Sequence, residues 1–272
     1  MSLILTLKNI LKIFYQFLLN KNIFHLELNV SEKNISKFFN LIHKHFIGVE
    51  LIRVGGKGDG GYLIPNDFTD IEFCFSPGVS YNASFENDLI DKGIHCYLAD
   101  NSVDKAPIVS DKITFIKKHI GVMDNDLYIT MDTWINSNTL KHNGLGILQM
   151  DIEGSEYPAL LSMSLENLNK FKYIIIEFHD LHQLFNSIGY DVIFSTFSKI
   201  LSQFNIVHIH PNNVFKSISC YEFEIFPIME FTFVNKSYNI NKPYLPTFPH
   251  QFDHKNVISK KEAVLPKCWH PF

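Results

Sequence analysis

The stretch that decides the fold covers residues 146–156 and reads GILQMDIEGSE. Its apolar first half is typical of a buried strand, and Gly154 is suited to turn the chain into a following helix. Three acidic residues, Asp151, Glu153 and Glu156, come directly after the apolar run. In open α/β sheets ligands bind outside the carboxyl ends of the strands, and a buried carboxylate without a partner is costly. The stretch therefore predicts a strand that ends at a ligand-binding cleft.

A simpler interpretation exists for two of these acids. Glu153 and Glu156 would stabilise the first turn of the next helix, where acidic side chains are favoured. This alternative is weaker for Asp151, which directly ends the apolar run.

A second apolar run, 172–176, is followed by Glu177 and His179. If the two strands are neighbours, Asp151, Glu177 and His179 converge on one cleft, because consecutive elements usually lie side by side. Side chains alternate along a strand, so Glu177 and His179 should share a face. The alternative for His179 is a loop histidine bonded to backbone.

A later strand, 206–209, ends in His210, which we expect over the same cleft, whereas His208 is expected to pack. Carboxylates and imidazole suit Mg²⁺ or Mn²⁺, and histidine alone also suits general base catalysis. The predicted catalytic residues are Asp151, His179, Glu153 and Glu156. The predicted metal ligands are Asp151, Glu177, His179 and His210.

The first half of the chain alternates strands and helices: strands at 71–75 and 96–99 surround a helix at 84–92. A turn with Gly78 follows the first strand and Asp100 ends the second, 22 residues later. This is close to the spacing of ~20 between a nucleotide-binding turn and the acid that binds ribose. The G-x-G-x-x-G turn of NAD enzymes is absent, which favours a ligand with ribose but no pyrophosphate, such as S-adenosylmethionine.

Two other segments are candidates for the same ligand. Residues 51–64 predict a glycine-rich hairpin whose backbone approaches a ligand closely, although a purely structural hairpin is an alternative. A third strand, 113–116, is followed by residues that would border an adenine ring or form a solvated surface. The predicted cofactor contacts are Gly78, Ser80, Asp100, Asn101, Ser102, Tyr62, Gly61, His119 and Ile120.

Further elements are expected along the rest of the chain. An extended piece is predicted at 127–134, and the remaining helices at 156–169 and 184–204. One or two strands at 223–234, broken at Pro227, would complete the sheet.

The composition limits the class of protein. The chain has 272 residues, of which 46% are hydrophobic, enough for one large domain. A net charge of -4 and a sequence pI near 6.3 argue against nucleic-acid binding. The four cysteines lie far apart, in neither a zinc nor a disulfide pattern, which fits a reducing cytoplasm.

The two ends of the chain are expected to lie outside the alternating strands and helices of the main domain. Residues 3–19 predict an apolar helix with a polar stripe, and lysines within it oppose a transmembrane span. This helix would pack on the domain or on a partner chain, as in a homodimer, or lie on the inner membrane surface. A second amphipathic helix is expected at 31–46, and a proline-rich tail wraps the domain. The predicted divisions are 1–50, a helical segment, 51–236, the main domain, and 237–272, the tail.

Several motifs together resemble the FkbM-type methyltransferases. They are RVGGKGDGGY at 53–62, FSPGVS at 75–80, LADNSV at 98–103, MDIEGSEY at 150–157 and IEFH at 176–179. The resemblance implies a class I S-adenosylmethionine-dependent methyltransferase with a Rossmann-like α/β fold. Its sheet would be mostly parallel and seven-stranded, with an antiparallel last strand, and N-terminal helices would be added to it.

The family also implies functions for particular residues. Gly78 and Asp100 would contact the cofactor, and Asp151 with its two neighbouring acids would lie at the methyl-transfer cleft. Ser80 stands where the usual turn has a second glycine, so the contacts expected at that position are less specific. Metal dependence is not general in the family, although the acids resemble the arrangement in metal-dependent O-methyltransferases.

Many relatives methylate sugar hydroxyls, which implies a nucleotide-linked sugar or a precursor of capsule or lipopolysaccharide as the acceptor. Two other classes remain open on the sequence alone. One is an NAD-type Rossmann oxidoreductase, and the other is a non-catalytic, membrane-associated binding protein. Cofactor binding distinguishes among them.

Overall fold

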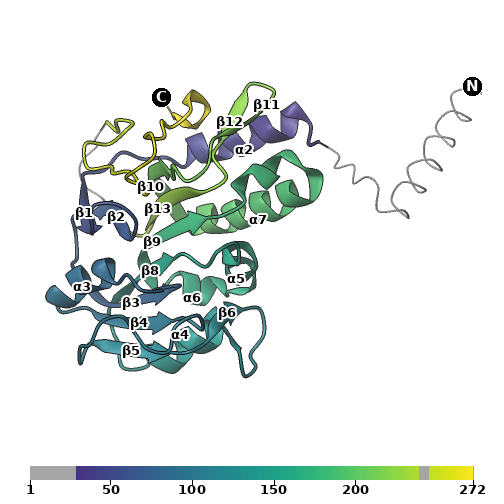
Figure 1. The fold of residues 1–272 in the computed structure, drawn as a ribbon. Coiled ribbons are helices and arrows are strands. Elements are labelled where there is room, and N and C mark those ends of the chain that lie inside the picture. Colours follow the sequence, from purple (N-terminus) through teal and green to yellow (C-terminus); the bar gives the residue numbers. More distant parts are fainter. Residues whose placement is uncertain (1–28, 239–244, 272) are drawn as a thin grey trace, which may run out of the picture.

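One sheet of seven strands forms the centre of the computed structural model, which describes residues 29–238 and 245–271. The strands lie side by side in the order β10, β13, β9, β8, β3, β4, β5 (Figure 1). Their bounds are β3 Ile71–Pro77, β4 His95–Ala99, β5 Ile113–Ile116, β8 Leu145–Met150, β9 Phe171–Phe178, β10 Phe204–Pro211 and β13 Met229–Asn235. Strand β13 runs antiparallel to both of its neighbours, and the other neighbouring pairs are parallel. The expected Rossmann-like α/β fold is confirmed.

The register brings the predicted acids to one edge of the sheet. Strands β8 and β9 are neighbours, as expected, and Met150 lies opposite Ile176. Strand β3 lies on the other side of β8, with Phe75 opposite Leu148. The loops after all three strands therefore meet at the same carboxyl edge.

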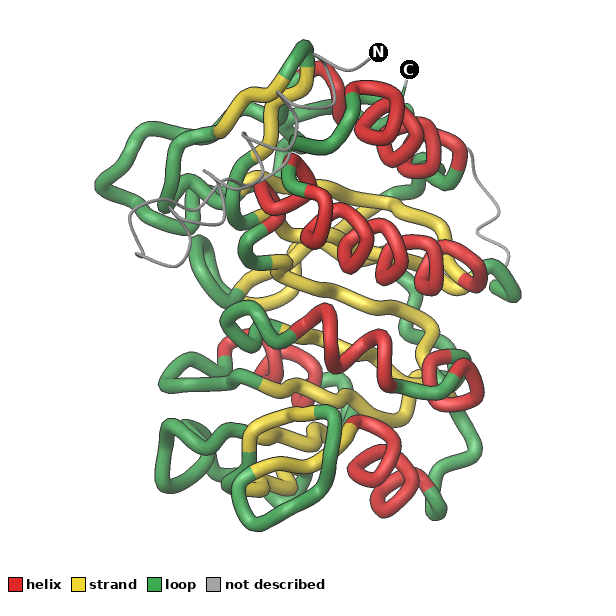
Figure 2. Tube along the Cα trace, turned by 90° about the vertical axis from the view of Figure 1, so that its right-hand side faces the viewer, coloured by secondary structure: helices red, strands yellow, loops and turns green. Residues whose placement is uncertain are grey.

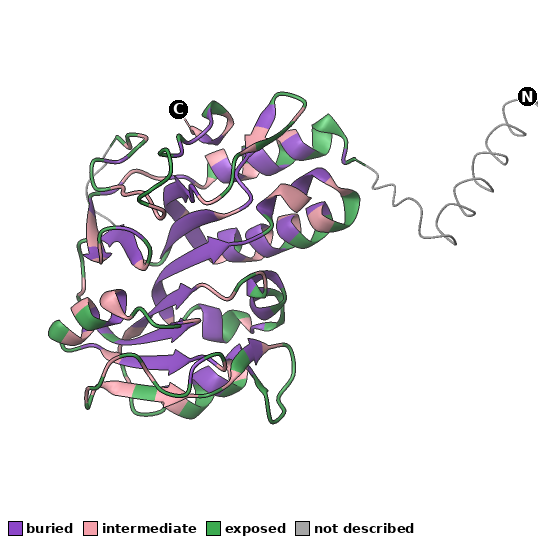
Figure 3. Cartoon of the chain, viewed as in Figure 1, coloured by how far each residue is buried: buried purple, intermediate pink, exposed green. Residues whose placement is uncertain are grey.

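The two faces of the sheet pack against different elements because side chains alternate along each strand. Phe75, Leu148 and Ile174 belong to a core cluster shared with the helices α2, α4, α5 and α7. Cys74 and Ile147 point to the opposite face and pack with α3 and the hairpin of β1 and β2. Figure 2 shows helices in front of one face of the sheet, and Figure 3 shows that the central strands are buried.

The helices fill the connections between strands. Their bounds are α2 Glu32–Lys44, α3 Ser84–Asp91, α4 Met131–Thr139, α5 Glu156–Ser162, α6 Leu165–Leu168 and α7 Ser187–Gln203, with 3-10 turns η1 Leu181–Phe185 and η2 Lys267–Trp269. The Ser31 side chain caps α2 by accepting from the backbone N–H of Asn34, as the sequence predicts. The apolar face of α2 packs into the main core.

Three expected elements are divided by polar caps. Of the extended piece at 127–134 only β7 forms, because the Thr130 side chain caps α4. The helix at 156–169 becomes α5 and α6, since Ser164 caps a new turn. The helix at 184–204 becomes η1 and α7, with Asn186 as the cap between them.

Among residues 29–238 and 245–271, three small two-stranded sheets lie outside the main one. Their strands are β1 Leu51–Gly55 with β2 Gly61–Pro65, β6 His119–Gly121 with β7 Tyr128–Thr130, and β11 Ile218–Cys220 with β12 Phe223–Ile225. The first is the expected glycine-rich hairpin. The expectation that 223–234 completes the sheet is correct only for β13, because β12 pairs with β11 instead.

The segment 245–271 packs against the main domain (yellow in Figure 1). Trp269 is fully buried and makes edge contacts with Phe38 and Phe39 of α2 and with Phe231 of β13. Its indole N–H donates to the carbonyl of Glu224 at 3.0 Å.

Within the described residues, no helix combines the length and apolar character needed to cross a membrane. The helix expected at 3–19 lies outside the described residues.

We predict that Trp269→Ala lowers the free energy of unfolding by about 3–5 kcal/mol, because it removes a buried aromatic side chain and leaves a cavity. Urea denaturation of the full chain measures this change. Ile258→Ala, at a side chain in the same segment that is 76% exposed, should stay within about 0.5 kcal/mol of the unchanged protein. A similar small loss for both variants would show that the segment does not stabilise the domain.

Candidate active site

A cavity of about 470 Å³ opens at the carboxyl ends of β3, β4 and β8. This is the position at which open α/β sheets bind ligands. Its lining residues are Asp59, Gly78, Ser80, Ala99, Asp100, Ser102, Lys118, His119, Ile120, Tyr128, Asp151, Ile152, Glu153 and Ser155. We call this space the first cavity.

Gly78 allows two loops to touch beneath the first cavity. Its φ angle is +88°, and a Cβ atom there would lie 1.6 Å from the carbonyl oxygen of Asp151. Only glycine permits both the left-handed backbone and this close approach. The turn after β3 is thereby joined to the acidic loop after β8.

Asp100 fixes the geometry of the cavity wall. One oxygen of its carboxylate accepts from the backbone N–H of Ser80 at 2.8 Å, and the other accepts from that of Ser102 at 2.7 Å. Each carboxylate oxygen retains acceptor capacity, so Asp100 lies ready to accept hydrogen bonds from a diol.

Most of the predicted cofactor residues reach the first cavity. Those that line it are Gly78, Ser80, Asp100, Ser102, His119 and Ile120. Tyr62 instead lines an adjoining cavity of about 70 Å³, and Asn101 donates to the His119 ring without lining either space. Gly61 pairs with Gly55 inside the hairpin and also lines neither.

Six residues that line the first cavity were not among the predicted site residues: Asp59, Ala99, Lys118, Tyr128, Ile152 and Ser155. Asp59 comes from the glycine-rich hairpin, where its acidic side chain among glycines was the available signal. Lys118 belongs to the residues after the third strand, for which either an adenine border or a solvated surface was expected, and it lines the first cavity. Tyr128 packs against His119 with 5.5 Å between ring centroids, a contact that no spacing rule predicts.

The acid-rich loop after β8 holds His179 in place. Glu156 is fully buried, and one of its oxygens accepts from the backbone N–H of Ile152 and from Nδ1 of His179, at 3.0 and 3.1 Å. Because both Glu156 oxygens also accept from Gly154 N–H, the carboxylate acts as an acceptor and Nδ1 as the donor. This leaves Nε2 of His179 as the acceptor nitrogen.

Nε2 of His179 faces the other two acids of the loop. It lies 3.8 Å from Oδ1 of Asp151 and 3.4 Å from Oε2 of Glu153. Burial alone would lower the pKa of His179. The hydrogen bond and the charge of Glu156 raise it, the other two acids of the loop add to this effect, and the net result is a raised pKa. Glu156 therefore positions the imidazole, whereas Asp151 and Glu153 line the first cavity.

Asp151 lies in a cluster of acids. It belongs with Asp59 and Glu177 to a group whose possible ligand oxygens lie within 4.8 Å of one another. Oδ1 of Asp151 and Oε2 of Glu177 are buried and have no hydrogen-bond partner. Burial raises the pKa of Asp151 to about 7, since the attraction of His179 only partly offsets desolvation and the nearby acids. Burial likewise raises the pKa of Glu177 well above its usual value.

The predicted metal set is divided in the structure. Asp151 lies with Glu156 and His179 in one group and with Asp59 and Glu177 in another. His210 is in neither of these groups: it lies with His208 and Asp253.

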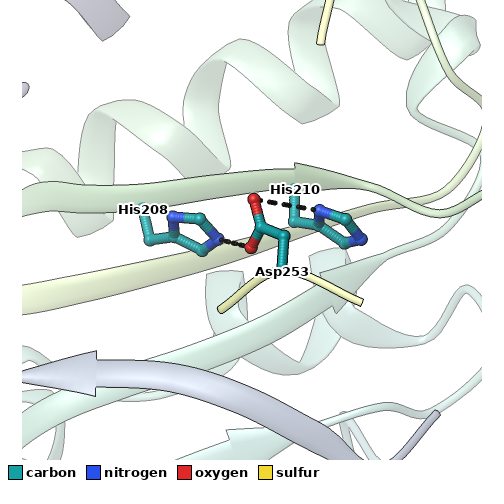
Figure 4. A group of neighbouring side chains, drawn as sticks. All are labelled: His208, His210 and Asp253. Atoms are coloured by element: carbon teal, nitrogen blue, oxygen red, sulfur yellow. Dashed lines mark hydrogen bonds and ion pairs between the residues drawn. The ribbon is translucent and has the colours of Figure 1, made fainter. Parts of the chain in front are cut away.

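Figure 4 shows Asp253 between the two histidines of β10. One carboxylate oxygen is 2.9 Å from Nε2 of His208, and the other is 3.6 Å from Nδ1 of His210. Because Asp253 comes from the C-terminal segment, sequence spacing could not show that it would draw His210 away from the cleft.

With this geometry established, the chain can be compared with known families. Residues 108–210 match the family model described as Methyltransferase FkbM domain. The chain contains an FkbM methyltransferase domain. No curated protein matches the sequence significantly. The matched span runs from before β5 into β10 and includes Asp151 and His179.

The FkbM domain makes this protein an S-adenosylmethionine-dependent methyltransferase. The residues of the first cavity fit that cofactor. Asp100 presents acceptors suited to ribose hydroxyls, and Gly78 lines the cavity at the turn after β3. The expected class of enzyme is confirmed.

We predict that Asp151→Asn becomes more stable relative to the unchanged protein as the pH rises from 5 to 8. The folded carboxyl has a pKa raised to about 7, so it holds a proton that the unfolded chain has already lost. Its contribution to stability is present at low pH and is lost, at up to ~1.4 kcal/mol per pH unit, between the unfolded pKa of about 4 and the folded pKa of about 7, above which the loss levels off.

Melting temperatures of both proteins from pH 5 to 8 show whether the stability of Asp151→Asn relative to the unchanged protein increases with pH. Asp104→Asn is the matched control, because Asp104 is an exposed acid whose pKa is lowered by its pair with Lys117. A difference between Asp151→Asn and the unchanged protein that stays constant or shrinks would contradict the raised pKa.

Proposed function

We propose that this methyltransferase transfers a methyl group to a sugar hydroxyl, an O-methylation. The observation that carries the proposal is the position of His179: Glu156 holds its ring so that Nε2 faces the acids that line the first cavity. A base at this point serves a hydroxyl acceptor, because a hydroxyl must lose its proton when it is methylated. S-adenosylmethionine, when bound, supplies the methyl group on a sulfonium that needs no further activation.

The protein residues then have separate tasks. Asp100 and Gly78 position the ribose and the remainder of the cofactor along the first cavity. Nε2 of His179 or the carboxylate of Asp151 accepts the proton of the acceptor hydroxyl. Most of the rate acceleration comes from holding donor and acceptor in line. Since the pKa values of both groups are raised, activity should increase as the pH rises through 7.

We also propose that a divalent metal assists the reaction. The group of Asp59, Asp151 and Glu177 offers hard oxygen ligands suited to Mg²⁺ or Mn²⁺, and it includes the two unpartnered buried oxygens. A cation held there would stabilise negative charge that develops on the acceptor oxygen. This set replaces His179 and His210 of the sequence prediction with Asp59.

The cysteines and the N-terminal sequence suggest where the protein is located and what it contacts. The four cysteines are all unpaired, which supports a cytoplasmic location. The acceptor would be a nucleotide-linked sugar or a precursor of a surface polysaccharide. Residues 3–19 would contact the inner face of the membrane or a second copy of the chain.

We predict that S-adenosylhomocysteine binds the purified chain and that Asp100→Ala weakens this binding by about 10- to 100-fold, since hydrogen bonds to a charged group are lost. Isothermal titration calorimetry measures both affinities. Asp104→Ala, at a nearby exposed acid, is the matched control and should bind normally. Binding of NAD instead of S-adenosylhomocysteine would favour an oxidoreductase, and binding of neither by folded protein would favour a non-catalytic role.

We predict that Mn²⁺ binds the metal-stripped protein and that Glu177→Gln weakens Mn²⁺ binding by at least about tenfold, because an anionic ligand is lost. Electron paramagnetic resonance of free Mn²⁺ measures this directly. Glu72→Gln, at a half-exposed acid far from the cleft, is the control. Equal Mn²⁺ binding by both variants would remove the metal from the proposal.

A further inference from the structure

A second cavity lies beside the first and shares three wall residues with it. It measures about 300 Å³, and the shared residues are Asp59, Asp151 and Glu153. Its remaining lining residues are Glu177, His179, Asn212, Val214, Phe215, Ile228, Asn256 and Val257. Asp151, one of the two proposed bases, therefore lies where the two cavities meet, and His179 lines the second cavity beside it.

The C-terminal segment supplies one wall of the second cavity, through Asn256 and Val257. The Asn213 side chain accepts from the backbone N–H of Val257 at 2.8 Å and donates to its carbonyl at 2.9 Å. The Asn256 amide donates to Glu230 of β13 at 2.6 Å.

A few residues earlier, Asp253 is held between His208 and His210 (Figure 4). Together these contacts fix the wall against β10 and β13. The walls of the second cavity are thus held in place by hydrogen bonds between the sheet edge and the C-terminal segment.

The second cavity has two kinds of wall. Val214, Phe215, Ile228 and Val257 provide apolar surface, and Phe215 is 56% exposed although it is a large aromatic residue. The other lining residues carry carboxyl and amide groups and the imidazole of His179, and the described residues that line the cavity include no lysine or arginine. A sugar ring, which has an apolar C–H face and a rim of hydroxyls, matches such a surface.

We propose that the second cavity is the acceptor subsite and that it admits one sugar ring that is neutral or carries an amino group, but no acidic group. This inference rests on the proposed O-methylation and specifies its substrate. The hydroxyl to be methylated would lie at Asp151 and His179, where the second cavity meets the first.

The size of the second cavity limits how much of the acceptor enters. Ligand pockets range over ~300–1,000 Å³, and this one is at the lower limit. A single ring fits, so a nucleotide or a longer glycan attached to the ring would remain outside. Any phosphate of a nucleotide-linked sugar would thereby stay away from the acids of the wall.

The charge of the wall excludes an acidic substituent on the ring. Asp59, Asp151 and Glu177 already lie within 4.8 Å of one another, and Glu153 adds a fourth acid. His179 is the only basic side chain among the described lining residues, so the wall keeps an excess of negative charge even when a divalent cation is bound. A carboxylate or phosphate added to this group would be desolvated beside like charges, which is strongly unfavourable. An ammonium group, by contrast, would be attracted.

Saturation-transfer NMR on the full chain with S-adenosylhomocysteine bound tests this selectivity. The probes are matched glycosides in gluco and galacto series: the methyl glycoside, its 2-amino form and its uronic acid. We expect saturation of neutral or amino forms and at least about tenfold weaker binding of the uronic acids. Equal or stronger binding of a uronic acid would overturn the exclusion of acidic rings.

A pair of aromatic variants tests the location. Phe215→Ala should weaken binding of the neutral sugars by about tenfold, because it removes the apolar platform. Phe252→Ala is the matched control, since Phe252 is 41% exposed, belongs to the C-terminal segment and lines neither cavity. Both variants should bind S-adenosylhomocysteine normally.

The outcomes separate the two levels of the proposal. If S-adenosylhomocysteine binds but no sugar does, or if Phe215→Ala binds sugars normally, the acceptor subsite is wrong and the methyltransferase assignment stands. If S-adenosylhomocysteine itself does not bind to folded protein, the proposed function fails first.

Discussion

The buried carboxylate of Glu156 is the interaction on which the site depends. It has no exposure to solvent and accepts hydrogen bonds from Ile152, Gly154 and His179. A buried carboxylate is stable only when its acceptor sites are used, and here they are used by two backbone groups and one ring. Since these donors come from the loop after β8 and from the end of β9, Glu156 ties two neighbouring strand ends together and orients the imidazole.

Asp151 differs from Glu156 in that its buried carboxylate is not fully hydrogen-bonded, and this difference indicates a functional role. Its Oδ1 is buried and has no hydrogen-bond partner, and Asp59 and Glu177 lie close to it. Such an arrangement lowers stability in the absence of a cation or a proton, so packing alone does not account for it. Acids whose pKa values are strongly raised cluster at functional sites, because there a proton or a charge is moved.

The sequence was sufficient for those features that local patterns determine. Apolar runs placed β3, β4, β8 and β9, and the residues just after them, such as Gly78, Asp100, Asp151 and His179, reach the cleft because parallel strands end at one edge. Helix lengths were predicted less well, since a single side-chain cap, as at Ser164, divides a periodic segment.

Contacts between distant segments could not be read from spacing. Asp253 lies 43 residues after His210, and only the folded chain brings them within 3.6 Å. The same is true of Asp59 and of the cavity wall at Val257. Residues from segments distant in the sequence therefore complete the site, and sequence patterns did not predict their positions.

Backbone strain is concentrated at the same edge of the sheet. Ser80, Glu153 and Asp180 adopt left-handed φ angles of 47°, 55° and 51° although none is glycine. Such conformations persist where surrounding contacts hold them, and they are common at ligand sites. Ser80 is held by Asp100, and Glu153 lies in the loop that Glu156 fixes.

The two cavities are built by different parts of the chain, and this has a consequence for specificity. The first cavity depends on the backbone turns after β3, β4 and β8. A side chain at Gly78 would clash with the carbonyl of Asp151, so this position tolerates almost no substitution. The second depends on side chains from the loop after β10 and from the C-terminal segment. Functional specificity resides in sites added to a fold rather than in the fold itself. Substitutions at Phe215 or Val257 can therefore alter the acceptor while the cofactor site and the positioned imidazole remain unchanged.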